Sequence, residues 1–145
     1  MVKQQIFISF LMNGVNKKYS VLVIEDDPHN LRFLQTLLSR YFYVTTCKTE
    51  SEFLNAISRE KFDIILMDIS LTEEKSGIEL VKVLRKIPIY KTIPIVVLSA
   101  HVAESDKFEA LNAGADLYLR KPVQNSILIE NLFSLLEGKN NLNVS

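Results

Sequence analysis

An unbroken run of apolar residues that ends in one carboxylate limits the fold of this chain more than any other feature. Residues 64–67 are Ile-Ile-Leu-Met, and Asp68 follows them directly. A short, continuous apolar run behind a helical pattern predicts a strand that is buried on both faces of a parallel sheet. Ligands bind at the carboxyl ends of the strands in such sheets, so Asp68 is expected at the mouth of a crevice.

A second stretch has the same form. Residues 21–24 are Val-Leu-Val-Ile, and Glu25, Asp26 and Asp27 follow them. If both strands are central and parallel, these carboxylates and Asp68 converge at one sheet edge, where burying several anions is costly without a cation. Oxygen ligands with no cysteine or histidine nearby suit a hard divalent ion, so the pattern predicts a Mg²⁺ site. For Asp27, a role as N-cap of the following helix outweighs a role as a ligand.

Composition places the chain among ordinary globular domains. It has 145 residues, 48% of them hydrophobic, and its 17 basic residues equal its 17 acidic residues. This balance predicts neither nucleic acid binding nor attachment to a membrane surface. The single Cys47 excludes an intrachain disulfide, fits a reducing compartment and is expected to be a small buried side chain. We therefore expect a cytoplasmic protein.

From residue 20 onward, the pattern alternates between strand and helix five times. The expected strands cover residues 20–25, 43–47, 62–68, 95–98 and 117–119. The expected helices start behind Asp27, Thr49 and Ser76 and cover 104–112 and 126–137. Five such units with right-handed crossovers predict an α/β fold, a flavodoxin-like (βα)5 three-layer sandwich whose parallel strands have the order 2-1-3-4-5.

The two ends of the chain lie outside this pattern. Residues 1–19 are expected to form an N-terminal extension rather than a targeting signal, because their apolar run is short and no cleavage site follows it. Met12 is an alternative start. Residues 20–138 are expected to form one domain and the asparagine-rich residues 139–145 a flexible tail. Since nothing follows residue 145 in this sequence, we expect a domain that acts on its own.

Two further polar residues end predicted strands at the same edge. Ser99 follows the fourth strand and Lys121 follows the fifth. A hydroxyl and an ammonium group beside a cluster of carboxylates and a metal ion form a phosphate site, in which the lysine acts as a point charge. The four strand ends together therefore predict a site that handles phosphate.

These residues, in this order, resemble the receiver domain of two-component response regulators. The resemblance covers residues 20 to about 137. It rests on Glu25-Asp26, Asp68, Ser99-Ala100, Gly114-Ala115-Asp116, Tyr118 and Lys121-Pro122. It implies a phosphoacceptor of a two-component or phosphorelay system, which takes a phosphoryl group from a phosphohistidine of a sensor histidine kinase or histidine phosphotransferase. The next partner would be a downstream protein target.

The resemblance also implies a role for each acidic residue. Asp68 is expected to be the phosphoacceptor, Asp26 to bind Mg²⁺ directly and Glu25 to bind it through water. The backbone carbonyl of Ser70 would complete the ligands that the protein provides. The protein would not be a conventional enzyme, but Mg²⁺-dependent self-phosphorylation from a donor and autodephosphorylation are expected.

The remaining matches imply a conformational switch. Ser99 is expected to hydrogen-bond the phosphoryl group, Lys121 to pair with it and Tyr118 to move inward. The peptide bond before Pro122 would be cis. The face made by the helix 104–112, the fifth strand and the last helix would be the output surface and a route to a homodimer.

Some interpretations stay open. On the last helix, Ile129 and Phe133 either close the edge of the core or form a partner patch. Thr72 stands where the family usually has a proline, and the loop after Asp68 is one residue longer than usual. A receiver-like interaction module that is never phosphorylated is the main alternative. A phosphatase of the haloacid dehalogenase type would need an aspartate where Ser70 stands, and no phosphate-cradling loop for a flavin follows the first strand.

Overall fold

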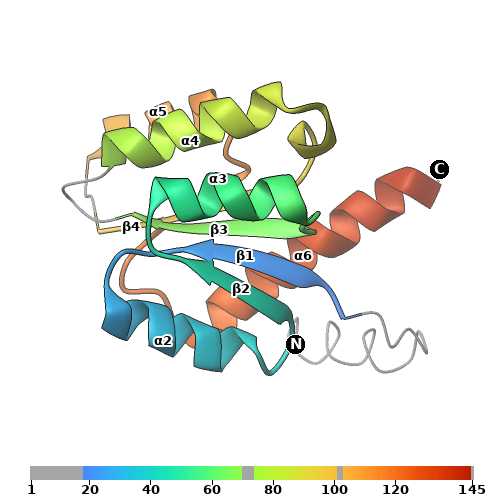
Figure 1. Ribbon diagram of the computed structural model, residues 1–145, viewed down its shortest axis with the longest axis horizontal. Coiled ribbons are helices and arrows are strands. Elements are labelled where there is room, and N and C mark those ends of the chain that lie inside the picture. Colours follow the sequence, from blue (N-terminus) through green and yellow to red (C-terminus); the bar gives the residue numbers. More distant parts are fainter. Residues whose placement is uncertain (1–17, 70–73, 101–102, 145) are drawn as a thin grey trace.

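Five parallel strands form one sheet that is covered by helices on both faces (Figure 1), in the computed structural model, which describes residues 18–69, 74–100 and 103–144. The strand order is β2-β1-β3-β4-β5, which confirms the predicted fold class and topology. The strands are β1 (Ser20–Ile24), β2 (Tyr43–Cys47), β3 (Ile64–Ile69), β4 (Ile95–Ser99) and β5 (Leu117–Arg120). The helices are α2 (Pro28–Leu38), α3 (Glu50–Arg59), α4 (Glu74–Lys86), α5 (Glu104–Ala113) and α6 (Asn125–Val144), with a 3-10 turn η1 (Pro88–Tyr90) before β4.

The sheet separates two apolar clusters. Helices α3, α4 and α5 cover one face and α2 and α6 cover the other (Figure 1). Strand residues alternate between the two clusters, as the pleat requires: in β3, Ile65 and Met67 point to the first and Ile64 and Leu66 to the second. All six residues of β3 are buried, so the apolar run next to Asp68 is a central strand, as predicted.

Side-chain caps fix where α2 and α3 begin. Asp27 Oδ1 accepts hydrogen bonds from the backbone N–H groups of His29 (2.7 Å) and Asn30 (3.1 Å), which confirms Asp27 as the N-cap of α2. Thr49 Oγ1 accepts one from the N–H group of Glu52 at 3.1 Å. The Glu52 carboxylate in turn accepts from the N–H group of Lys48 at 2.7 Å. These caps therefore fix the first residues of both helices, close behind the ends of β1 and β2.

Several expected boundaries were wrong. Helix α4 begins at Glu74, so the capping pattern at Ser76 lies inside the helix; Glu74 and Lys75 are themselves good helix formers, which a four-residue pattern cannot detect. Helix α6 continues beyond Glu137 to Val144, because one glycine in a helix costs only about 1 kcal/mol. Whether that end is flexible stays a prediction. Residues 1–17, which include Met12, lie outside the described residues.

Apolar residues at helical spacing in α2, α3 and α4, Leu54 among them, predict the inner face of each helix, and the structure follows these stripes with few exceptions. Leu31, Leu34 and Leu38 of α2 are buried, whereas Leu54 of α3 is 38% exposed, against expectation. Phe133 is buried and stacks on Phe42 with ring centroids 4.9 Å apart, so the core interpretation of this residue is correct. The residues responsible for the remaining stripes are likewise buried, namely Phe53, Ile57, Ile78, Val81 and Leu84.

The single cysteine is part of the core. Cys47 ends β2 and is 1% exposed, as predicted, and its burial raises the pKa of the thiol to about 12. The thiol is therefore protonated at neutral pH and unreactive. Among the described residues, no helix is both long and apolar enough to cross a membrane.

Candidate functional site

Two buried carboxylates meet at the carboxyl ends of β1 and β3. Ile24 of β1 is in register with Met67 of β3. The next residues along the two strands, Glu25 and Asp68, therefore lie side by side. The side chain of Glu25 is 2% exposed and that of Asp68 4% exposed. Adjacent parallel strands therefore bring together the two carboxylates that the sequence predicted to converge.

Lys121 provides the positive charge at this edge. It follows β5, and its ammonium group contacts Asp68 Oδ1 and lies 3.8 Å from Glu25 Oε2. The backbone N–H group of Lys121 donates to the carbonyl of Ser99 at 2.8 Å, which anchors the segment to the end of β4. The Lys121-Pro122 peptide bond is cis, as expected. A single ammonium group thus lies next to two buried carboxyl groups.

Burial strongly raises the pKa of the Glu25 carboxyl. Together with the neighbouring carboxylate of Asp68, it brings this pKa to about 9. The backbone N–H group of Asp27 donates to Glu25 Oε1 at 2.9 Å and acts in the opposite direction. Without a bound cation, Glu25 is therefore protonated near neutral pH and can donate a hydrogen bond to the carboxylate of Asp68.

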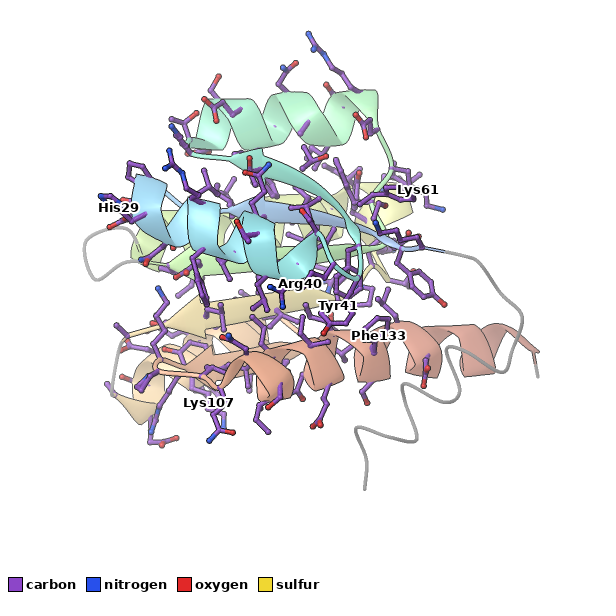
Figure 2. The ribbon with its side chains drawn as sticks, turned by 90° about the horizontal axis from the view of Figure 1, so that it is seen from below. His29, Arg40, Tyr41, Lys61, Lys107 and Phe133 are labelled. Carbon is purple, nitrogen blue, oxygen red and sulfur yellow. The ribbon has the colours of Figure 1, made fainter. Side chains whose placement is uncertain are left out.

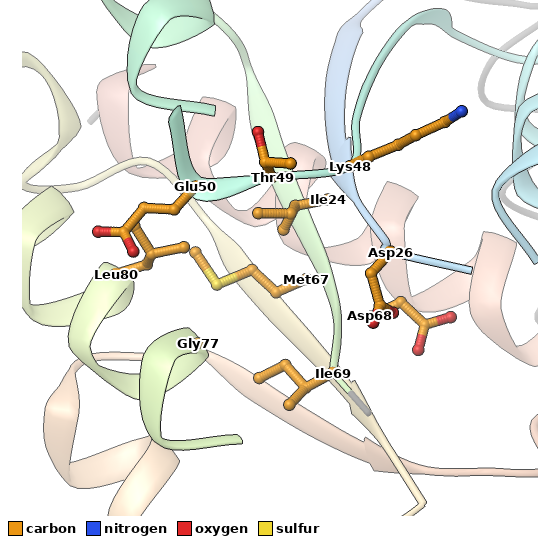
Figure 3. A pocket seen from close by; sticks show the side chains of 10 residues that line it. All are labelled: Ile24, Asp26, Lys48, Thr49, Glu50, Met67, Asp68, Ile69, Gly77 and Leu80. Atoms are coloured by element: carbon orange, nitrogen blue, oxygen red, sulfur yellow. The ribbon is translucent and has the colours of Figure 1, made fainter. Parts of the chain in front are cut away.

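The other two acidic residues of the loop after β1 are exposed, whereas Glu25 is buried. Asp26 is exposed and lines a cavity of about 230 Å³ together with Asp68. Figure 3 shows Asp26 and Asp68 close together on one side of this cavity, with Glu50 and Leu80 on the opposite side. Asp27 is exposed, and the N–H groups of Asn30 and His29 lower the pKa of its carboxyl. It acts as a helix cap.

The predicted switch residues lie on β4 and β5. Ser99 is fully buried at the end of β4, opposite Ile69 in the neighbouring strand. Tyr118 is 5% exposed and belongs to the cluster under α3, α4 and α5. Its ring is therefore buried in this structure, and its movement on phosphorylation stays a prediction. Ser70 and Thr72, which belong to the loop after Asp68, lie outside the described residues.

The donor set suits a hard cation, but it is incomplete among the described residues. Glu25 Oε2 and Asp68 Oδ1 are buried oxygens with no hydrogen bond from any described residue, and Lys121 is their nearest cation. Oxygen atoms of this kind fit Mg²⁺. Among the residues that the structure describes, however, no three acidic, histidine or cysteine side chains gather closely enough to hold a metal ion. The remaining ligands would have to come from Asp26 by rotation, from water and from the backbone of Ser70.

A second cavity, of about 490 Å³, opens on the other side of Asp68, between α2 and the start of α6. It is mostly apolar and is lined by Asn30, Phe33, Leu34, Asp68, Leu98, Lys121, Pro122, Val123, Asn125 and Leu128. Phe33 is 53% exposed there. Phe33 was not among the predicted site residues, although a large aromatic side chain off the inner stripe of α2 was a visible signal.

Comparisons with known proteins agree with this geometry. The sequence profile of the response regulator receiver domain matches residues 21–133. The transcriptional regulatory protein KdpE of Mycobacterium tuberculosis is 41% identical over 103 residues, which are 70% of this chain and 44% of KdpE. An uncharacterized 14.6 kDa protein of Leptolyngbya boryana is 33% identical over 71% of this chain and 79% of its own length.

A solved structure supports the same relationship. The receiver domain of the Francisella response regulator 1452 is 30% identical, covers 84% of this chain and 99% of its own, and superposes with a TM-score of 0.74. The chain spans less than half the length of KdpE, so its similarity to that protein concerns one domain of it.

Proposed function

Because this chain belongs to the response regulator receiver domain family, we propose that it is a phosphoacceptor whose Asp68 takes a phosphoryl group from a phosphohistidine of a partner protein. The observation that supports this most is the buried carboxylate of Asp68, held against the ammonium group of Lys121 at the carboxyl edge of the sheet. Phosphorylation-based signalling is the activity of this family.

The reaction requires a nucleophile and charge compensation. An oxygen of the Asp68 carboxylate attacks phosphorus, the bond from phosphorus to the histidine nitrogen of the donor breaks, and the imidazole leaves and takes a proton from solvent. Lys121 lies where it can pair with the transferred group, because it already contacts Asp68 Oδ1. A phosphoryl group on Asp68 would be within the reach of the same ammonium group throughout the reaction.

Receiver domains bind Mg²⁺ for phosphorylation, and in this chain Glu25, Asp26, Asp68 and the backbone carbonyl of Ser70 would hold the ion. When bound, Mg²⁺ supplies positive charge to the oxygens of the transferred phosphoryl group. Glu25 would give up its proton at that point, since a bound cation favours the charged carboxylate.

The donor and the target would use separate surfaces. The apolar cavity beside Asp68, with Phe33 exposed at its rim, supports a protein donor that docks against α2 and the start of α6. The face of α5, β5 and α6 is our candidate for the downstream target and for a homodimer. Phe108 and Leu111 of α5 are 69% and 39% exposed there. Ser99 and Tyr118 lie under this face and would transmit the change.

The test is phosphorylation by a small acyl phosphate with Mg²⁺, followed by intact mass spectrometry. We expect one phosphoryl adduct, which is absent in Asp68→Asn. Asp27→Asn is the matched control, because it removes an exposed carboxylate from the same edge and keeps the helix cap. An adduct that persists in Asp68→Asn would refute the assignment. The alternative, a module that is never phosphorylated, predicts no adduct from any donor.

A further inference from the structure

Charge in this molecule is separated along the strand direction, although the chain as a whole is neutral. The acidic residues of the site lie where the strands end. At the opposite end, where the strands begin, basic side chains occur in every connection except the one before β5. We call this set the basic edge; it consists of Lys18, Arg40, Arg59, Lys61, Lys86 and Lys91. In Figure 2, Lys61 lies at this end and His29 lies at the other.

Most of the basic edge is unpaired. Except for Lys18, which lies over the ring of Tyr43, its members are exposed and form no ion pair or side-chain hydrogen bond with any described residue. Three acidic residues lie nearby: Glu60 is exposed between Arg59 and Lys61, and the other two are occupied. Asp63 accepts hydrogen bonds from Ser20, and Asp116 pairs with Arg85 at 2.8 Å. Among the described residues of this edge, six basic side chains therefore face three acidic ones, and the edge keeps an excess of positive charge.

Helix dipoles account for only part of this set. Arg59 and Lys86 lie in the last turns of α3 and α4, where a cation stabilises the helix terminus. Arg40, Lys61 and Lys91 lie beyond the helix ends, in connections. These three side chains form no ion pair or hydrogen bond with a described residue, so no interaction within the described fold explains their charge.

Two apolar side chains accompany the charges. Ile89 in η1 is 54% exposed and lies two residues before Lys91, and Tyr43 at the start of β2 is 64% exposed. The basic residues come from connections spread across the width of the sheet, and the two cavities described above lie at the opposite edge. The last turns of α6 extend past this edge (Figure 1), so a partner must also accommodate them. This arrangement suits a broad, deformable anionic surface that also accepts apolar groups, rather than a strand of nucleic acid in a groove.

We infer that the basic edge binds the surface of a membrane that contains anionic lipids. Its lysine and arginine side chains contact the headgroups, and Ile89 and Tyr43 enter the interface. Because the acidic edge is repelled by the same surface, the domain binds in one orientation, with Asp68 directed away from the bilayer. In this orientation the proposed phosphorylation site stays accessible to a donor protein. The inference goes beyond the proposed function and does not depend on it.

Cosedimentation of the full chain with lipid vesicles tests the inference. One set of vesicles contains phosphatidylserine and phosphatidylcholine, and the other contains phosphatidylcholine alone. Each basic residue at an anionic surface strengthens binding about fivefold, so Arg40→Gln/Lys61→Gln/Lys91→Gln should weaken it about a hundredfold. The matched control is Arg32→Gln/Lys48→Gln/Lys107→Gln, which removes the same charge from exposed positions on α2, directly after β2 and on α5.

Binding to the anionic vesicles alone, lost in the first triple variant and kept in the control, is the expected result. Circular dichroism establishes that both variants are folded. Equal losses in the two variants would overturn the inference, because they would indicate net charge rather than this edge. It would also be overturned if the folded wild-type chain bound neither kind of vesicle, or if it bound an oligonucleotide instead.

Discussion

Replacing Glu25 by glutamine should make the metal-free protein more stable at neutral and alkaline pH. The glutamine can still accept from the N–H group of Asp27, and its amide group can donate to Asp68 in place of the proton. The variant therefore keeps the hydrogen bonds of the site and removes a group that is costly to ionise. The size of the effect follows from the pKa of Glu25.

The sign of the pH dependence is fixed by linkage. The pKa of Glu25 is raised from 4.5 to about 9 on folding, so between these values the folded state holds a proton that the unfolded chain has released. Stability then falls as pH rises through this interval and is constant below it. One pKa unit corresponds to about 1.4 kcal/mol, so the wild-type protein should lose at most about 4 kcal/mol between pH 5 and pH 8 through this group.

Urea unfolding at a series of pH values, in the presence of a chelator, measures this loss. Because the chain has no tryptophan, circular dichroism at far-ultraviolet wavelengths is the suitable signal. Glu25→Gln should lack the downward slope, and Asp27→Asn, which removes an exposed carboxylate, should retain it. Parallel slopes in the wild-type protein and Glu25→Gln would show that Glu25 is ionised in the folded state, and the reasoning would fail.

Three other changes test separate parts of the structure. Lys121→Ala should keep some phosphorylation of Asp68, measured by intact mass, but lose the conformational response, measured by comparing NMR spectra before and after phosphorylation; an unchanged response would exclude the proposed role. Thr49→Ala should lower the free energy of unfolding by about 1 kcal/mol in urea titrations, because it removes the cap of α3; a neutral result would mean that water replaces the cap. Arg85→Ala should cost about 3 kcal/mol in the same assay, because it leaves Asp116 and several carbonyl groups without their donor; a loss below about 1 kcal/mol would show that these groups find water instead.

The sheet and the position of the site could be predicted because each depends on short-range information. A continuous apolar run specifies a buried strand, and the side chain that follows such a run must lie at the sheet edge. Asp68, Ser99 and Lys121 were located in this way. The caps at Asp27 and Thr49 were predictable for a similar reason, since the donor and acceptor lie within three residues of each other.

Features that depend on distant residues could not be predicted. The protonation of Glu25 results from its burial and from Asp68 on another strand, and the contact of Lys121 with Asp68 depends on the order of the strands. The neutral composition likewise gave no indication of the basic edge, because its residues are spread from Lys18 to Lys91 and only the parallel topology collects them. The start of α4 was predicted wrongly for a local reason, because the capping pattern at Ser76 also fits the interior of a helix.

The division of the interior into two apolar clusters has a consequence for how such a sequence can diverge. Val81 in one cluster and Leu132 in the other lie on opposite faces of the sheet, so the costs of substituting them should simply add. Each layer can therefore accumulate changes on its own, and a lineage could alter the face that meets one partner while conserving the other. The edge where Glu25, Asp68 and Lys121 meet has no such independence, because any change there must suit the ends of three strands at once.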